Sequence, residues 1–205
     1  MRLIVGLGNP GPGYVRTPHN LGFRVIDHLG ERAGIRIQRP EGKSLIGRGR
    51  LAGAEVVLAK PQIYMNASGL AVRELIERLE GEAERIIVVV DDASLPAGAL
   101  RIRERGSAGG HNGLKSVIGA LGTDEFIRVR LGVGGAEPGE DLAERVLRPM
   151  SETEEEQAAE QIERAADAVE LILRQGAGAA MNRFNRRAEP PGEEESAGGK
   201  PSGAN

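Results

Sequence analysis

The dipeptide His-Asn occurs twice in the chain, as His19-Asn20 and as His111-Asn112, and each copy closes a glycine-bearing loop. The chain holds only three histidines, so two of them share a similar local sequence. Histidine takes up a proton near neutral pH, and asparagine offers both a donor and an acceptor without charge. Residues of these types can activate a water molecule and hold a carbonyl group. The chain has no cysteine, which excludes thiolate catalysis and cysteine-based zinc sites.

The composition is that of one globular domain. The 205 residues are 40% hydrophobic, 28% charged and 2% aromatic, so we expect a core of Val, Ile, Leu and Ala. No apolar run reaches the roughly 18 residues of a membrane span, and the apolar run at the start is too short for a signal peptide. We therefore expect a cytoplasmic protein that does not span a membrane.

The formal net charge of −3 hides an uneven distribution along the chain. The first 150 residues hold 21 Lys and Arg against 18 Asp and Glu, whereas residues 151–205 hold 6 against 12. The part that carries the candidate chemistry is thus mildly basic. An acidic average does not exclude a nucleic-acid partner, because local patches do the binding.

Strand and helix patterns alternate along the chain, which predicts an α/β domain. The β-branched run Ile86–Val90 is typical of a strand covered on both faces, Ser151 and Glu154 form a capping box that opens a long helix, and Leu70 is expected on the inner face of its helix. We predict a single domain over residues 1–187, with a mixed twisted β-sheet flanked by helices, and a polar, disordered tail over residues 188–205. The expected strands cover residues 2–7, 45–52, 54–60, 86–90, 99–104 and 126–133, with a hairpin turn at Gly53; the expected helices cover 21–33, 67–79 and 112–121, then the long helix and a short last one with Met181 and Phe184.

The run Gly6–Gly11 matches the dinucleotide-binding pattern GxGxxG after a strand. In dinucleotide-binding proteins a helix begins at that turn, so that its amide groups meet a pyrophosphate. Pro10, Pro12 and Gly13 prevent a helix here, and the acidic residue expected about 20 residues on is missing. A dinucleotide oxidoreductase is therefore a weak alternative. The glycines are expected to let the backbone lie against another ligand, with Asn9 directed into the site.

His19 lies at the start of an expected helix for which Asn20 is the predicted N-cap. A lone histidine there is by default a solvated surface residue; His28, in the same helix with no polar companion, is assigned no role. His19 differs because Asn9 and Asp91 both follow strands, and ligands collect at the carboxyl ends of strands in α/β sheets. An aspartate beside a histidine ring fixes its tautomer and stabilises the imidazolium. His19 and Asp91 are therefore predicted to form a base that activates water.

Two further segments carry polar side chains. Asn66 follows a strand, where it is either a helix N-cap, a role that Ser68 could also fill, or an amide aimed at a substrate carbonyl. The glycine-rich loop 106–113 enters a helix and suits an anion. Arg128 and Arg130 alternate on a strand, where they form either a solvated strand face or an extension of a basic face. The basic residues that flank the loop and suit a phosphate partner are Arg101, Arg103, Arg105 and Lys115.

Several unusual motifs lie in order over about residues 1–185. They are Gly6–Gly11, Tyr14, Thr17–Asn20, Lys60-Pro61, Tyr64–Asn66, Ser68-Gly69, Asp91 and Gly109–Lys115. Together they resemble the bacterial-type peptidyl-tRNA hydrolase family. The resemblance implies a single α/β domain, usually monomeric, that hydrolyses the ester between a peptide and the 3′-terminal ribose of tRNA during translation, with no metal or other cofactor. The expected partner is peptidyl-tRNA, held at its acceptor stem and CCA end.

Position by position, the resemblance implies that His19 is the catalytic base and that Asp91 orients it. Asn66 or a nearby backbone amide is expected to stabilise the oxyanion, and Met65 to pack against His19. The residues expected to line the substrate cleft are Asn9, Tyr14, Met65, Asn66, His111 and Asn112. Those expected to meet tRNA phosphates are Arg101, Arg103, Arg105, Lys115, Arg128 and Arg130.

Two positions depart from the family pattern. Pro18 stands where the family usually has an arginine, and Ser94 where it often has a second aspartate. Both departures bear on how the tRNA end is gripped. The alternative from another class is an RNA-binding protein on this fold that does not hydrolyse its ligand, and release of peptide from peptidyl-tRNA distinguishes the two.

Overall fold

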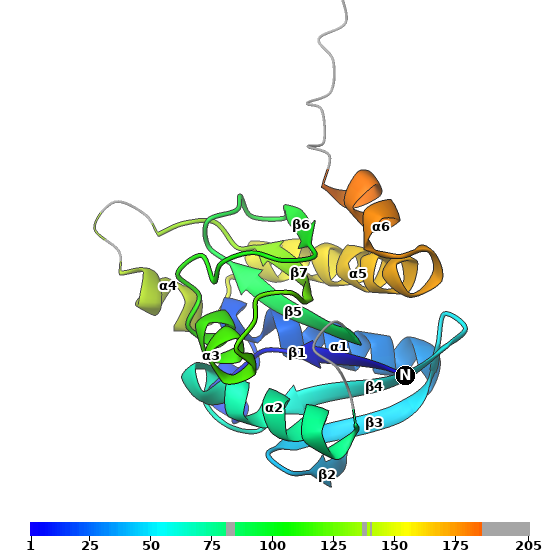
Figure 1. Ribbon diagram of the computed structural model, residues 1–205. Helices are drawn as coiled ribbons and strands as arrows, with labels where there is room; N and C mark the ends of the chain where they lie inside the picture. The colour runs from blue at the N-terminus through cyan, green and yellow to red at the C-terminus, as the bar shows by residue number, and fades with distance from the viewer. Residues whose placement is uncertain (81–84, 137–138, 140, 186–205) are drawn as a thin grey trace, which may run out of the picture.

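The centre of the molecule is a mixed, twisted sheet of seven strands (Figure 1). The computed structural model describes residues 1–80, 85–136, 139 and 141–185. The strands are β1 (Arg2–Gly6), β2 (Arg39–Glu41), β3 (Ser44–Leu51), β4 (Ala54–Pro61), β5 (Ile86–Asp92), β6 (Leu100–Arg103) and β7 (Ile127–Gly132). Their order is β2-β3-β4-β1-β5-β7-β6, in which β4, β1, β5 and β7 are parallel and the others pair antiparallel. The predicted fold class is confirmed.

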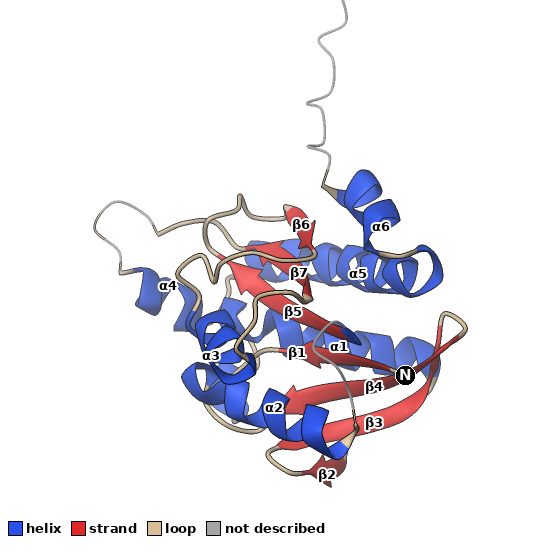
Figure 2. Cartoon of the chain, in the orientation of Figure 1, coloured by secondary structure: helices blue, strands red, loops and turns tan. Residues whose placement is uncertain are grey.

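Helices cover both faces of the sheet (Figure 2). One face carries α1 (Leu21–Ala33), α5 (Glu152–Gln175) and α6 (Ala177–Phe184), and the other carries α2 (Ser68–Arg78) and α3 (Asn112–Leu121). The remaining described elements are the short helix α4 (Leu142–Leu147) and the 3-10 turns η1 (Pro12–Tyr14), η2 (Pro18–Asn20) and η3 (Met65–Ala67).

The alternation of side chains along β1 explains these layers. Ile4 belongs to the core cluster shared with α1 and α5, whereas Leu3 and Val5 belong to the cluster shared with α2 and α3. β5 is buried at every position, as the run Ile86–Val90 predicts. Each fully buried aliphatic side chain contributes about 1.5–3 kcal/mol, so this two-sided core fixes which strands lie at the centre of the sheet.

The predicted hairpin and capping box are both confirmed. Ala52 and Gly53 join β3 to β4 with φ values of 52° and 86°, as a two-residue turn with positive φ at both positions requires. The Ser151 side chain accepts the N–H of Glu154, whose carboxylate accepts the N–H of Ser151, so both halves of the capping box are made. No helix in the described ranges is long and apolar enough to cross a membrane.

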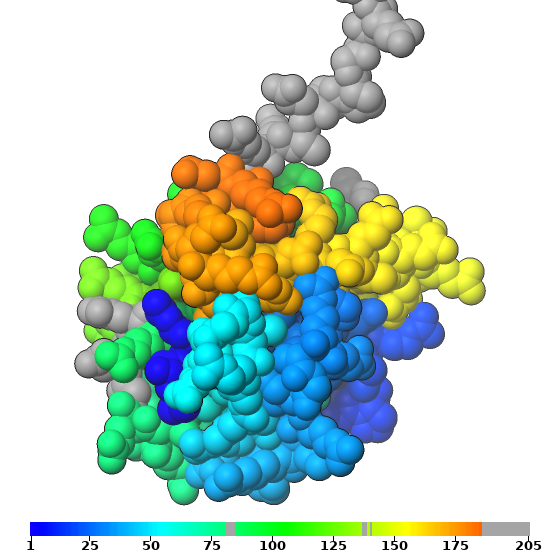
Figure 3. Space-filling view, turned by 90° about the vertical axis from the view of Figure 1, so that its right-hand side faces the viewer, coloured from blue at the N-terminus to red at the C-terminus, as the bar shows by residue number. Residues whose placement is uncertain are grey.

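Asn185, at the end of the described chain, covers part of the outer edge of β6. Its Oδ1 accepts the N–H of Ile102 at 2.7 Å, and its Nδ2 donates to the carbonyl of Ile102 at 3.0 Å. β6 is the last strand of the sheet, so these backbone groups have no neighbouring strand. Figure 3 views the molecule from the end at which β1 begins, where α6 and the β3–β4 hairpin lie at the surface.

Some local predictions are wrong. Leu70 is 48% exposed rather than packed inward. Asn20 occupies the N-cap position of α1, but its side chain makes no cap bond; α2 likewise begins after Ala67 without a side-chain cap. β2 and α4 were not predicted, because they are short and carry charged or proline residues. The predicted tail, residues 188–205, and the domain boundary at 187 lie outside the described residues.

Candidate active site

Three parallel strands deliver residues predicted for the site to one edge of the sheet. β1 leads to Asn9, β4 leads to Met65, and β5 ends with Asp91 and Asp92. These strands are neighbours, with β1 in the middle, so their carboxyl ends lie side by side (Figure 1). The carboxyl edge of such a sheet is where ligands bind.

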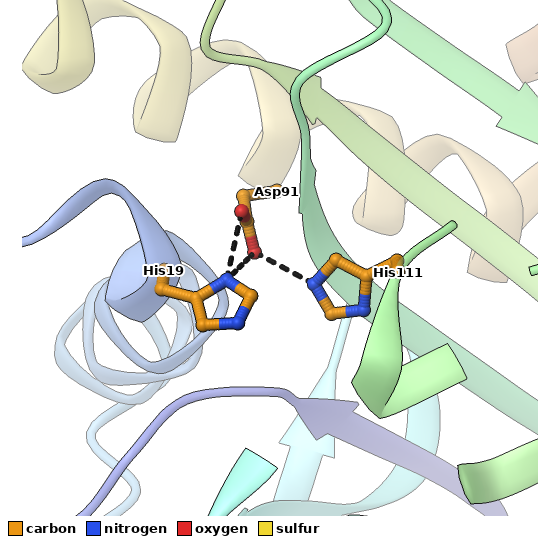
Figure 4. Close-up of side chains that lie close together, drawn as sticks. All are labelled: His19, Asp91 and His111. Atoms are coloured by element: carbon orange, nitrogen blue, oxygen red, sulfur yellow. Dashed lines mark hydrogen bonds and ion pairs between the residues drawn. The ribbon is translucent and has the colours of Figure 1, made fainter. Parts of the chain in front are cut away.

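His19 and Asp91 lie at the centre of the site (Figure 4). His19 Nδ1 lies 2.9 Å from Oδ2 and 3.0 Å from Oδ1 of Asp91, and the two residues are 9% and 2% exposed. An ionised carboxylate only accepts hydrogen bonds, so Nδ1 carries the proton and donates it. Nε2 of His19 makes no hydrogen bond to a described residue and keeps a lone pair, as a general base requires.

The second histidine of the repeated dipeptide binds the same carboxylate. His111 Nε2 lies 3.0 Å from Asp91 Oδ1, and its Nδ1 accepts the backbone N–H of Leu114 at 3.2 Å. Since Nδ1 is an acceptor, the ring proton is on Nε2, and His111 also donates to Asp91. The rings of His19 and His111 are 4.9 Å apart between centroids. We expected His111 to line the substrate cleft but did not expect it to share the carboxylate of Asp91 with His19. The repeated His-Asn dipeptide was the one sign in the sequence that the two histidines have related roles.

The two histidines decide the charge of Asp91. Burial alone would raise the pKa of this carboxyl, because a charged group loses its hydration in the interior. The electrostatic attraction and hydrogen bond of His111, together with those of His19, outweigh burial and hold the pKa of Asp91 well below its usual range. Asp91 is therefore an ionised acceptor for both rings at neutral pH.

These three residues also have the composition of a metal site. One ligand atom each from His19, Asp91 and His111 lie within 4.8 Å of one another, and such donors suit zinc. A metal-bound histidine, however, donates its other ring N–H to an acceptor. Nδ1 of His111 faces the N–H of Leu114, so binding a cation through Nε2 would set two donors against each other. The hydrogen bonds therefore favour an Asp91 carboxylate that accepts N–H groups from both histidines, rather than a metal ion.

Asn9 is held beside the site by its neighbours. Asn20 Oδ1 accepts the backbone N–H of Asn9 at 2.8 Å, and Asn20 Nδ2 donates to the carbonyl of Asn9 at 2.9 Å. The side-chain oxygen of Asn9 accepts the N–H of Met65 at 2.8 Å. Only Nδ2 of Asn9 is without a hydrogen-bond partner among the described residues. A ligand contact of Asn9 must therefore use this group as a donor, and the supporting role of Asn20 was not foreseen.

A cavity of about 580 Å³ opens beside His19, Asp91 and His111. Asn112 lines it together with His19, Asp91 and His111. The other side of this cavity is an apolar wall supplied by α4, which the sequence did not predict. The α4 side chains in this wall are Leu142, Ala143, Val146 and Leu147.

The other residues predicted for the cleft, Asn9, Tyr14, Met65 and Asn66, are not among the residues that line this cavity. Tyr14 is half-buried in η1, and Asn66 is exposed in η3. Met65 is buried, and its sulfur lies against Gly113 beside the ring of His111. The structure thus brings Met65 to the second histidine of the site.

The glycines that imitate a dinucleotide motif serve packing. A side chain at Gly6 would overlap the carbonyl of Gly22, and one at Gly8 would come within 2.7 Å of the Phe23 ring. The absence of side chains lets the end of β1 lie directly against the start of α1, and η2 places His19 there. This close approach accounts for the motif without a pyrophosphate.

The comparison with known proteins identifies the family. The family model described as peptidyl-tRNA hydrolase matches residues 3–192. The chain belongs to the peptidyl-tRNA hydrolase family. Peptidyl-tRNA hydrolases of Koribacter versatilis and Lachnoclostridium phytofermentans are 51% identical over 192 residues and 48% identical over 187 residues, which cover 93% and 91% of this chain and 96% and 98% of theirs. The crystal structure of the Acinetobacter baumannii enzyme has a TM-score of 0.85 at 32% identity, covering 90% of this chain and 94% of that one. Members of the peptidyl-tRNA hydrolase family act on an ester bond, and this chain is a hydrolase of that class.

Four arginines of this peptidyl-tRNA hydrolase form a ladder across β6 and β7. Arg101 pairs with Arg130 and Arg103 with Arg128 in the antiparallel register, so all four side chains leave the same face of the sheet. Like charges directly opposite one another destabilise a sheet. Arg101 and Arg103 are exposed and remain candidates for phosphate contacts.

Arg128 is a correction to the predicted phosphate contacts. It is 1% exposed, and its guanidinium donates to the backbone carbonyls of Gly106, Asp124 and Phe126. Burial lowers its pKa. Arg128 therefore holds the loop that returns toward His111 and is not available to a phosphate.

The remaining basic residues differ in exposure. Arg130 is largely buried, and its Nε lies 2.9 Å from Asp92 Oδ2. Arg105 is exposed, with Glu125 at 3.9 Å, and Lys115 is exposed on α3. Of the six basic residues predicted to meet phosphates, Arg101, Arg103, Arg105 and Lys115 are thus exposed.

Both departures from the family pattern have structural partners. Pro18 is the first residue of η2, where its fixed φ suits the start of a helical turn. Ser94 Oγ donates to Asp92 Oδ1 at 2.7 Å. A further correction concerns His28, which was expected to have no polar companion. Its Nε2 accepts a hydrogen bond from Arg32, one turn further along α1, at 2.9 Å.

Proposed function

We propose that this peptidyl-tRNA hydrolase cleaves the ester between the peptide and the 3′-terminal ribose of tRNA with a water molecule activated by His19, without a covalent intermediate. The observation that carries the proposal is the hydrogen bond from His19 Nδ1 to Asp91, which leaves Nε2 as a base facing away from the carboxylate. No cysteine exists in the chain, and Ser94, which lines the cavity, donates its hydroxyl to Asp92 at 2.7 Å rather than to His19. Water is therefore the nucleophile.

The reaction then follows from the positions of the protons. Nε2 of His19 takes a proton from water as the oxygen attacks the ester carbonyl, and Asp91 stabilises the imidazolium without taking the proton itself. The tetrahedral intermediate collapses by breaking the bond to the ribose oxygen, which receives the proton from Nε2. General base catalysis of this kind is worth roughly 10² to 10⁴ in rate. Asn66 or a nearby backbone amide is assigned to the oxyanion.

The partner is peptidyl-tRNA, bound through its acceptor stem and CCA end. Arg101, Arg103, Arg105 and Lys115 supply exposed positive charge, and duplex RNA is read mainly through its shape and phosphates. Tyr14, Asn9 and Asn112 are assigned to the single-stranded end and the peptide. The proposal includes action as a monomer in the cytoplasm, without a metal or other cofactor.

The test is release of a labelled peptide from peptidyl-tRNA by the purified protein. His19→Ala should lower turnover at least a hundredfold, because the base is lost, while tRNA binding persists. His28→Ala is the matched control, since it removes a histidine of α1 outside the site, and should leave the rate unchanged. Wild-type protein that binds tRNA but releases no peptide would instead support a binding protein on this fold.

A further inference from the structure

Helix α4 presents one face to the catalytic cavity and the other to the start of α5. Leu142, Val146 and Leu147 belong to the apolar wall of the cavity. Arg145, on the other face, and Arg148, the residue after the helix, both bind Glu154. A helix of six residues is not stable alone. The contacts on its far face therefore decide where the apolar wall stands.

Glu154 is the common partner of these two arginines. Its Oε1 lies 2.8 Å from Nη2 of Arg145. Arg148 donates from Nη1 to Oε2 at 2.9 Å and from Nη2 to Oε1 at 3.0 Å, which is the bidentate geometry of strong charge-assisted bonds. Arg145 Nη2 also donates to the carbonyl of Val133 at 3.1 Å. The carboxylate of Glu154 thereby joins α4 to the first turn of α5, and Arg145 joins α4 to the residue that follows β7.

The burial of Arg145 makes it dependent on this carboxylate. Arg145 is 9% exposed, and its Nη1 is buried with no hydrogen-bond partner among the described residues. With Glu154 and Pro18 it lines a cavity of about 150 Å³ next to η2, the turn that carries His19. The hydrogen bond of Arg148 lowers the pKa of Glu154 to about 2, although partial burial opposes this shift. Removing one partner of such a pair leaves a buried charge uncompensated, which is strongly unfavourable.

We propose that Glu154, acting through Arg145 and Arg148, is a positioning residue that holds the apolar wall of α4 against the substrate and so sets the affinity for the peptide part of peptidyl-tRNA. The inference rests on the proposed function, because it assigns the peptide to the cavity beside His19. None of the hydrogen bonds among His19, Asp91 and His111 involves these residues. The chemical step should therefore proceed normally once substrate is bound.

Two substitutions separate this role from helix capping. Glu154→Gln removes the charge that binds the arginines but keeps the capping box, which accepts either Glu or Gln at this position. Ser151→Ala removes the hydroxyl half of the box and leaves the carboxylate. Glu154→Gln should raise KM for N-acetyl-phenylalanyl-tRNA roughly five- to tenfold, about the net worth of one ordinary hydrogen bond, with kcat within about twofold. Ser151→Ala should leave KM unchanged.

The nature of the peptide provides a second comparison. The wall is apolar, so Glu154→Gln should raise KM much less for N-acetyl-glycyl-tRNA, which offers no side chain to it. An equal rise for both substrates, an unchanged KM, or the same rise in Ser151→Ala would each overturn the proposal.

A third measurement does not depend on activity. Amide hydrogen exchange over residues 142–147 should be faster in Glu154→Gln than in the wild type, and unchanged in Ser151→Ala. Unaltered exchange in Glu154→Gln would overturn the proposal, whether or not the enzyme releases peptide. If instead the expected exchange pattern is found but the wild type has no hydrolase activity, only the assignment of the reaction and of the peptide site is refuted.

Discussion

Replacing Asp91 by asparagine should place the ring proton of His19 on the wrong nitrogen. The N–H of Leu114 holds His111 as a donor through Nε2, so the oxygen of the introduced amide is required at His111. Its NH₂ group then takes the place of Oδ2, the oxygen nearer to Nδ1 of His19 at 2.9 Å. His19 can only accept that hydrogen bond through a lone pair on Nδ1, which moves its proton to Nε2. The base would lose the lone pair that water needs.

The size of the effect follows from what is lost. A positioned general base is worth roughly 10² to 10⁴ in rate, which corresponds to about 2.7–5.5 kcal/mol of barrier. The substitution keeps the volume of the side chain, so we expect Asp91→Asn to fold and to lower kcat at least a hundredfold. Its affinity for tRNA should stay within about twofold, since Asp91 does not belong to the exposed basic surface. Single-turnover release of a labelled N-acetyl-aminoacyl group measures the rate, and ¹⁵N NMR of the histidine rings reports the tautomers.

A second substitution tests the reasoning itself. His111→Asn keeps a side-chain acceptor for the N–H of Leu114, because asparagine is a good N-cap, but removes the donor to residue 91. In the double variant of Asp91→Asn and His111→Asn the introduced amide can turn its oxygen to His19, and the rate should exceed that of Asp91→Asn alone. A wild-type rate in Asp91→Asn, or a proton found on Nδ1 of His19 in that variant, would refute the argument.

Three further outcomes follow from the geometry. The wild type should lose about 1–2 kcal/mol of stability between pH 4.5 and 2 relative to Glu154→Gln, as measured by urea unfolding. The pKa of Glu154 in the folded protein is lowered from 4.5 to about 2, so the stabilisation by its carboxylate is present above pH 4.5 and is lost as acid protonates the group; solvent screening reduces its size. Parallel pH profiles for the two proteins would contradict this. Gly6→Ala should cost about 3 kcal/mol or more because the added methyl overlaps backbone, and an unchanged melting temperature would show that α1 can shift. Arg101→Gln and Arg103→Gln should each reduce the salt dependence of tRNA binding by about one counterion, whereas Arg128→Gln should lower stability and leave that slope alone; the reverse pattern would place the phosphates elsewhere.

The elements with strong local signals could be predicted from the sequence. Ile86–Val90 is long, continuous and β-branched, so it could only be a central strand, and that assignment also placed Asp91 at the ligand-binding edge. The capping box at Ser151 was equally clear, because both of its hydrogen bonds are local. The pairing of His19 with Asp91 was inferred from this topology and from the resemblance to a family.

Contacts between distant loops could not be predicted in this way. His111 lies 20 residues from Asp91, and the repeated dipeptide indicates a shared setting for the two histidines but not that the loop of His111 folds back onto the carboxylate. Arg128 was expected to be open to a phosphate because strand alternation tells which residues share a face, not whether a loop covers them; the backbone at Gly106 does cover it. Helix α4 was missed because six residues, two of them charged, give no periodic signal.

The side-chain amide of Asn185 imitates one residue of a neighbouring strand. By occupying both backbone groups of Ile102, it removes a place where an extended segment from another molecule could add to the sheet, which is a common route to aggregation. A shortened version of the protein that stops before this residue would uncover that place beside the arginine ladder. The residue that follows α6 therefore shortens the free edge that this sheet offers to another molecule.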